Sequence, residues 1–139
     1  MPSIKDLIEL ASRLDVRVAW VRLDGEAGRW VPERSMILLN SRLVAREEVC
    51  TLAHELGHAF HRHPSSGSSG SSGARADVEA QADEYAAMLL ISEDEYRRAE
   101  VEVGCSHPGA LAEALDVDAR IVEARQRILD GGPPAVPRA

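Results

Sequence analysis

The sequence is short of cysteine, of positive charge and of long apolar runs, and each shortage excludes a class of protein. Its 139 residues include two cysteines, which excludes a disulfide-rich scaffold and favours free thiols in the cytoplasm. The formal net charge of −7 argues against nonspecific nucleic-acid binding, which needs a basic surface. No apolar run reaches the roughly 18 residues of a membrane span. The amphipathic N-terminus also lacks the apolar segment of a secretory signal. We therefore expect a cytoplasmic protein that binds no membrane.

The length suits one compact domain, since 139 residues can bury a core but cannot form two full-sized units. We predict a single domain over residues 1–130. Residues 65–73, SSGSSGSSG, form a regular triplet repeat with no side chain able to pack, which predicts a flexible linker. We interpret this linker as an engineered replacement for a natural loop. Residues 131–139, rich in glycine and proline, predict a disordered tail.

Apolar spacing predicts an α+β fold. A helical pattern over residues 4–14 precedes an alternating strand pattern over 16–23, a short strand around Trp30 and a more buried strand over 35–40. Helical patterns follow at 46–62, 77–90, 94–103 and 108–129. We expect a small three-stranded antiparallel sheet packed by the helix at 46–62 and by the further helices. We also expect the strand at 35–40 to form an edge of the sheet, where an extended peptide could pair with it.

Residues 52–64, LAHELGHAFHRHP, carry four of the five histidines, three of them within the helix predicted at 46–62. His54, Glu55 and His58 spell the motif HExxH. An α-helix places residues four apart on one face, about 6 Å from each other, so both histidines can bind one ion. Glu55 then lies beside that ion as a general base. Both histidines project away from the apolar stripe of the helix, which indicates a helix that lines a cleft.

A second helical pattern carries two carboxylates on one face. Glu79 and Asp83 are also four residues apart, so Glu79 could be a third metal ligand. Asp83 could accept a hydrogen bond from the second nitrogen of a ligand histidine. Two histidines, one carboxylate and an open fourth position are typical of a catalytic zinc site. By themselves the two carboxylates would indicate a solvated helix face, and it is the HExxH motif that favours the metal site.

The remaining histidines and cysteines have other interpretations. His61 lies about 10 Å along the helix axis from the first motif histidine, too far to share its ion. His63 precedes Pro64, where the helix should end, and we interpret it as solvated. Cys50 could be a soft ligand, but we interpret it as a small buried thiol. Cys105 lies near a predicted helix junction and carries no assignment.

The two motifs together resemble the ImmA/IrrE family of bacterial and phage metallopeptidases, a gluzincin-like group. The resemblance runs through TLAHELGHAF at residues 51–60 and VEAQADEYAAMLLIS at residues 78–92, and more loosely through the N-terminal helix and strands. Within the second segment, Tyr85 and the LLIS stretch match an aromatic position and a helix end of the family, which predicts that they belong to the core.

The resemblance implies a zinc peptidase, with another divalent metal such as Mn²⁺ as an alternative. It carries over the site residues one by one, with His54, His58 and Glu79 as metal ligands, Glu55 as general base and Asp83 behind a ligand histidine. It also implies a substrate, namely a repressor or another DNA-binding regulator that is cut to release stress-response, mobile-element or prophage genes.

Three functions stay open at this point. The first is a zinc endopeptidase, for which His107 is the candidate donor to the oxyanion. The second is a non-catalytic regulator that a metal stabilises and that binds a repressor or DNA, which the presence of Glu55 disfavours. The third is DNA binding through residues 111–129, whose spacing resembles a helix-turn-helix. Five acidic residues against three arginines over 105–131 disfavour this third function, so we expect no direct nucleic-acid binding.

Overall fold

The computed structural model describes residues 1–65 and 72–131. The first part contains α1 (Ile4–Arg13), β1 (Arg17–Val21), β2 (Gly28–Val31), the 3-10 helix η1 (Pro32–Arg34), β3 (Met36–Asn40) and α2 (Ala45–Phe60). The second part is helical, with α3 (Ser72–Leu90), α4 (Glu93–Val103), α5 (Pro108–Leu115) and α6 (Ala119–Gly131). The predicted linker and tail fall largely on residues 66–71 and 132–139, outside the described residues. Among the described helices, none combines the length and apolarity that spanning a bilayer requires.

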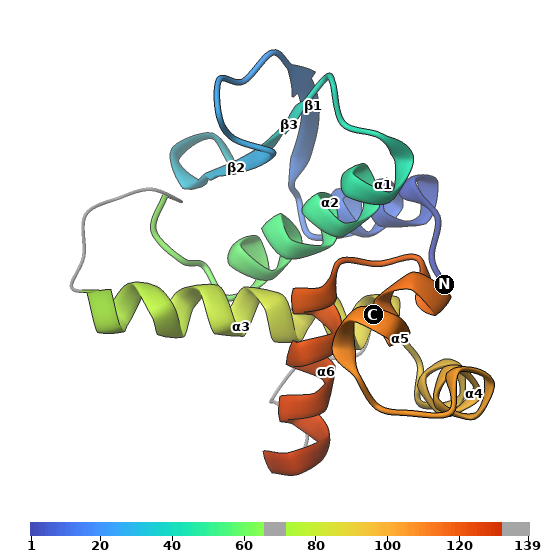
Figure 1. Cartoon of the computed structure of the whole chain (residues 1–139). Coiled ribbons are helices and arrows are strands. Elements are labelled where there is room, and N and C mark those ends of the chain that lie inside the picture. Colours follow the sequence, from blue (N-terminus) through green and yellow to red (C-terminus); the bar gives the residue numbers. More distant parts are fainter. Residues whose placement is uncertain (66–71, 132–139) are drawn as a thin grey trace.

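The elements stack in layers around α2. The sheet covers one side of α2 and α3 crosses its other side, while α6 packs against α3 and joins α4 and α5 in a helical end of the molecule (Figure 1). The α+β class is therefore confirmed. α3 begins at Ser72, five residues before the helix start predicted at Asp77 and inside the segment predicted as linker.

The prediction of an all-antiparallel sheet is wrong. The strand order is β1-β3-β2, with β2 antiparallel to β3 but β1 parallel to it. The most apolar strand takes the centre, where Ile37 and Leu39 are fully buried and both of its edges are paired. Asn40 Nδ2 donates to the carbonyl oxygens of Leu23 and Glu26, which holds the connection that crosses from β1 to β2. The edges of this sheet are thus β1 and β2, and the strand at 35–40 is not an edge.

α2 is buried all round over most of its length. Every residue from Cys50 to His58 is less than a tenth exposed, including the polar members of the HExxH motif. The apolar stripe with Leu52 and Leu56 belongs to the main core, as predicted. The opposite face, which we predicted to line a cleft, packs against α3. Polar groups on that face must therefore find partners inside the protein.

Candidate metal centre

Two small residues set the distance between α2 and α3. A Cβ added at Gly57 would lie 2.8 Å from the Cα and 2.8 Å from the carbonyl oxygen of Ala82, closer than real Cβ atoms approach. The two backbones therefore touch at this point. His58 follows Gly57 and Asp83 follows Ala82, so the crossing brings the motif histidines of α2 to the carboxylates of α3.

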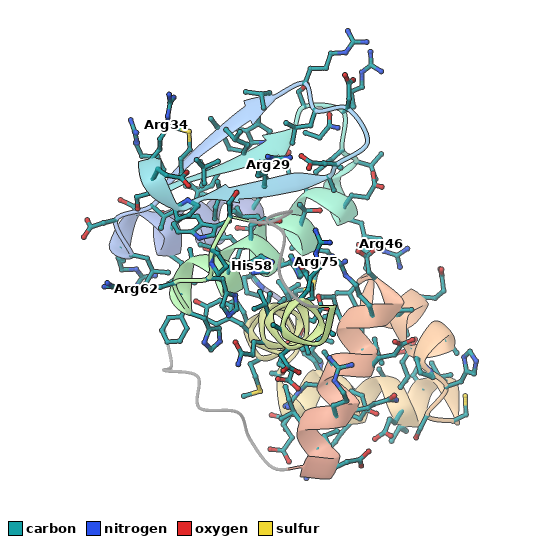
Figure 2. All side chains as sticks on the ribbon, turned by 90° about the vertical axis from the view of Figure 1, so that its left-hand side faces the viewer. Arg29, Arg34, Arg46, His58, Arg62 and Arg75 are labelled. Atoms are coloured by element: carbon teal, nitrogen blue, oxygen red, sulfur yellow. The ribbon has the colours of Figure 1, made fainter. Side chains whose placement is uncertain are left out.

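His54, His58 and Glu79 converge on one point. The two Nε2 atoms are 3.1 Å apart, and Glu79 places Oε2 2.9 Å from His54 Nε2 and Oε1 3.5 Å from His58 Nε2. Tetrahedral zinc with bonds of about 2.0–2.2 Å needs neighbouring ligand atoms about 3.3–3.6 Å apart. The three groups therefore fit such an ion with shifts of a few tenths of an ångström. Figure 2 shows His58 in the layer between the sheet, which carries Arg29, and α3, which carries Arg75.

The site has one accessible side. The side chain of Glu79 is 44% exposed, whereas those of His54 and His58 are almost completely buried. A metal held by these three groups would thus face the protein on one side and solvent on the other. Such an open position is what separates a catalytic zinc site from a structural one.

The histidines and carboxylates of the site shift one another's pKa values. Burial alone would lower the pKa of His54, but its hydrogen bonds to Asp83 and Glu79 outweigh burial and raise the pKa to about 9. Hydrogen bonds from the same histidine and from His58 hold the pKa of Glu79 well below its usual range. Carboxylates thus surround the two imidazoles, which favours a cation at this point, whether a proton or a metal ion.

Glu55 is the buried carboxylate next to this cluster. It is 4% exposed, and its Oε2 has no hydrogen-bond partner among the described residues. Burial raises the pKa of Glu55, while the neighbouring charges of His54 and His58 oppose that shift. A buried carboxylate with an unsatisfied oxygen is costly unless something binds there. Its position beside the cluster fits a water molecule or a substrate group as that partner.

Asp83 lies behind His54, as the sequence predicted. Its Oδ1 accepts a hydrogen bond from His54 Nδ1 at 2.7 Å, which leaves Nε2 for a metal. Arg120 at the start of α6 forms an ion pair with the same oxygen, and its Nε lies 3.5 Å away. α6 thus contributes a positive charge next to the site, a contribution that no local pattern indicated.

A protein-family model covers most of the chain. The chain matches the model of the IrrE N-terminal-like domain, Peptidase_M78, over residues 11–126. The chain belongs to this family. The resemblance seen in the two motifs is therefore confirmed, and membership supports a metallopeptidase-type function. A comparison with curated proteins finds no match.

His63 is the residue next to the site that the sequence interpretation missed. We interpreted it as solvated, but it is 7% exposed and its Nδ1 lies 2.9 Å from His58 Nδ1. The cause is a Schellman motif at the end of α2, in which His63 N–H donates to His58 O and Arg62 N–H donates to Ala59 O. Arg62 adopts the left-handed conformation, with φ of 55°, that folds the chain back. A glycine at this position would have indicated the turn, and the arginine did not.

Other singled-out residues lie outside the cluster. His61 is no member of the His54, His58 and Glu79 group, as predicted, and packs against Phe60 and His63. Cys50 is buried and likewise belongs to no group that could hold a metal within the described chain. His107 is exposed and caps α5, where its Nδ1 accepts from Gly109 N and Ala110 N. We therefore assign His107 to helix capping. Tyr85 is buried and stacks on Phe60, consistent with a core position.

The sheet edge nearest the site is β2. A Cβ added at Gly28 would lie 2.6 Å from Thr51 Cγ2 and 3.3 Å from Glu55 Cγ, so glycine allows β2 to approach the motif closely. Asn40 N–H donates to Ala27 O, and the antiparallel register continues with Gly28 opposite Leu39. Because hydrogen-bonded and non-hydrogen-bonded pairs alternate, the backbone N–H and C=O of Gly28 point away from β3.

Proposed function

We propose that the protein is a zinc-dependent endopeptidase that hydrolyses a peptide bond in a protein substrate. The observation that supports this proposal is the buried Oε2 of Glu55, which has no hydrogen-bond partner within the described part of the chain and lies beside three residues able to hold a metal. A structural zinc site has four protein ligands and needs no base. The three converging ligands, the open side at Glu79 and the buried carboxylate therefore favour catalysis over a non-catalytic, metal-stabilised regulator.

The site residues have distinct roles in this reaction. His54, His58 and Glu79 would hold the zinc ion, which supplies a Lewis acid and lowers the pKa of a bound water. Glu55 takes a proton from the attacking water and delivers it to the leaving amine. Burial, which raises the pKa of Glu55, suits a group that first accepts and then returns a proton.

The substrate segment is proposed to bind along β2. The edge of β2 passes close to Glu55, and the backbone groups of Gly28 face away from the sheet. An extended peptide that paired with this edge would place its backbone beside the base. Main-chain pairing gives affinity with little sequence preference, so selection would fall to a few side-chain pockets and to the partner that exposes a flexible segment.

The substrate we propose is a repressor or another DNA-binding transcriptional regulator of phage, mobile-element or stress-response genes. The support is the family resemblance, together with an edge strand that suits an extended segment of a larger protein. Such a substrate places the enzyme in the cytoplasm. The buried, unpaired Cys50 is consistent with a reducing compartment.

Direct DNA binding through α5 and α6 is less well supported. These helices do form a pair joined by a short turn, as their spacing predicted. The three arginines of α6 face α3, however: Arg120 pairs with Asp83, Arg127 pairs with Glu84, and Arg125 is buried. All three arginines are thus engaged with α3, and the acidic residues of this pair would repel phosphate.

The test combines metal analysis with cleavage of regulators co-expressed from the source genome. Wild-type protein should contain zinc and cut one of these regulators. Glu55→Gln should keep its zinc and lose cleavage by at least 100-fold, because it removes the base and leaves the ligands. Glu102→Gln, at an exposed glutamate of α4, is the matched control and should cleave normally. Cleavage by Glu55→Gln at the wild-type rate would exclude the proposed role.

A further inference from the structure

We propose that His63 and Gln81 are positioning residues that hold His58 in the tautomer and orientation needed for metal binding. The inference rests on the metal centre proposed above and extends it to two residues that are not ligands. The three side chains form a continuous line. His58 Nδ1 lies 2.9 Å from His63 Nδ1, and His63 Nε2 lies 2.7 Å from Gln81 Oε1. At the other end of the line, His58 Nε2 faces His54 and Glu79.

The direction of each hydrogen bond follows from the atoms at the two ends. Gln81 Oε1 is a carbonyl oxygen and can only accept, so His63 Nε2 donates to it. A neutral imidazole has one N–H, so His63 Nδ1 is an acceptor and receives the N–H of His58 Nδ1. His58 Nε2 is then left with a lone pair. The amide oxygen of Gln81 thus selects, through two rings, the tautomer of His58 that can bind a metal.

The backbone holds His63 in place from both sides. Its N–H donates to His58 O at 2.9 Å, and its carbonyl oxygen accepts from Trp30 Nε1 at 3.0 Å. The ring of His61 stacks on the ring of His63, with centroids 5.2 Å apart and 15° between the planes. The position of this imidazole is therefore determined by the end of α2 and by β2. An imidazole so constrained can orient its neighbour rather than follow it.

The two ligand histidines have different kinds of hydrogen-bond partner at Nδ1. His54 Nδ1 meets the carboxylate of Asp83, whereas His58 Nδ1 meets a neutral imidazole. A carboxylate behind His58 would add a further negative charge close to Glu79 and to the buried Glu55. The imidazole of His63 orients the His58 ring without adding that charge.

The first test measures the zinc dissociation constant of the full chain by competition with a chromophoric chelator. His63→Leu removes the acceptor, so zinc should bind roughly 10- to 100-fold more weakly. His63→Asn keeps an oxygen acceptor on a short side chain and should recover most of that loss. His61→Phe is the matched control, because it keeps a ring that can stack on His63 and removes only the imidazole nitrogens, so zinc affinity should stay unchanged. Circular dichroism of the metal-free variants checks that each one folds.

The second test reads the tautomers directly in the wild-type protein. Nitrogen-15 imidazole spectra of the zinc-loaded chain should show His63 protonated at Nε2 and unprotonated at Nδ1, with His58 protonated at Nδ1. A proton on His63 Nδ1 would overturn the proposal, and so would equal zinc affinity in the wild type and in His63→Leu. Failure of the wild type to bind zinc would overturn the metal centre as well, so the two failures are distinguishable.

Discussion

Gly57 of α2 and Ala82 of α3 lie so close that a Cβ at position 57 would sit 2.8 Å from the backbone of Ala82. The contact lies one residue before His58 on one helix and one residue before Asp83 on the other. It therefore sets how far the ligand histidines are from the carboxylates of α3. The metal centre depends on two small residues that take no part in binding the metal.

We expect Gly57→Ala to force the two helices apart. Alanine favours a helix by about 1 kcal/mol over glycine, but the added methyl meets backbone that cannot move aside. The free energy of unfolding should fall by about 1–3 kcal/mol, measured by urea denaturation of the metal-free chain. Gly131→Ala adds a methyl with no neighbouring atom of residues 1–65 or 72–131 within 4 Å and should not destabilise the protein. A Gly57→Ala protein as stable as the wild type would contradict the close crossing.

Zinc should raise the melting temperature of the wild-type protein, because the ion binds the folded state. At a thousand times its dissociation constant, a ligand adds about 4 kcal/mol to stability. His58→Ala removes a ligand and should lose most of this shift, whereas His61→Phe, which keeps a ring that can stack on His63, should keep it. Differential scanning calorimetry with zinc and with a chelator measures the difference. Identical wild-type curves under the two conditions would mean that no metal site forms.

Asp83→Asn should weaken zinc binding without abolishing it. The amide oxygen can still accept the N–H of His54 Nδ1, but the negative charge that orients and polarises the ring is lost. We expect a loss of affinity of roughly 10- to 100-fold, measured by chelator competition. Glu84→Gln neutralises the adjacent carboxylate, which pairs with Arg127 at 3.6 Å, and serves as the matched control. If both variants weakened zinc binding equally, Asp83 would act only through its negative charge and not through its position behind His54.

The two cysteines should react at very different rates. Cys50 is fully buried, and burial raises the pKa of its thiol to about 11. At mildly alkaline pH this thiol stays protonated and shielded, so iodoacetamide should modify only the exposed Cys105 in the folded protein. Mass spectrometry counts the modified sites, and both cysteines should react in urea. Rapid modification of Cys50 in the folded chain would show that α2 opens readily.

The residues at the centre of the site can be predicted from the sequence because their spacing within each helix is local. A spacing of four residues in a helix brings His54 to His58 and Glu79 to Asp83 wherever the helices lie. Helix periodicity likewise predicts the apolar stripe of α2. The fold class follows from the order of such patterns. The HExxH motif together with Glu79 and Asp83 indicated the family. These features depend on neighbours along the chain, which a sequence displays directly.

The order of the sheet and the role of His63 were decided by contacts between distant segments. β3 takes the centre because Ile37 and Leu39 are buried in the core and both edges of the strand are paired, and Asn40 at its end holds the loop that crosses from β1 to β2. His63 reaches His58 through a left-handed Arg62 and a hydrogen bond from Trp30 on β2. Local propensity disfavours a left-handed arginine, and only the energy of packing in the folded chain offsets that cost. Tertiary structure therefore decided what lies behind the second ligand and which strand borders the site.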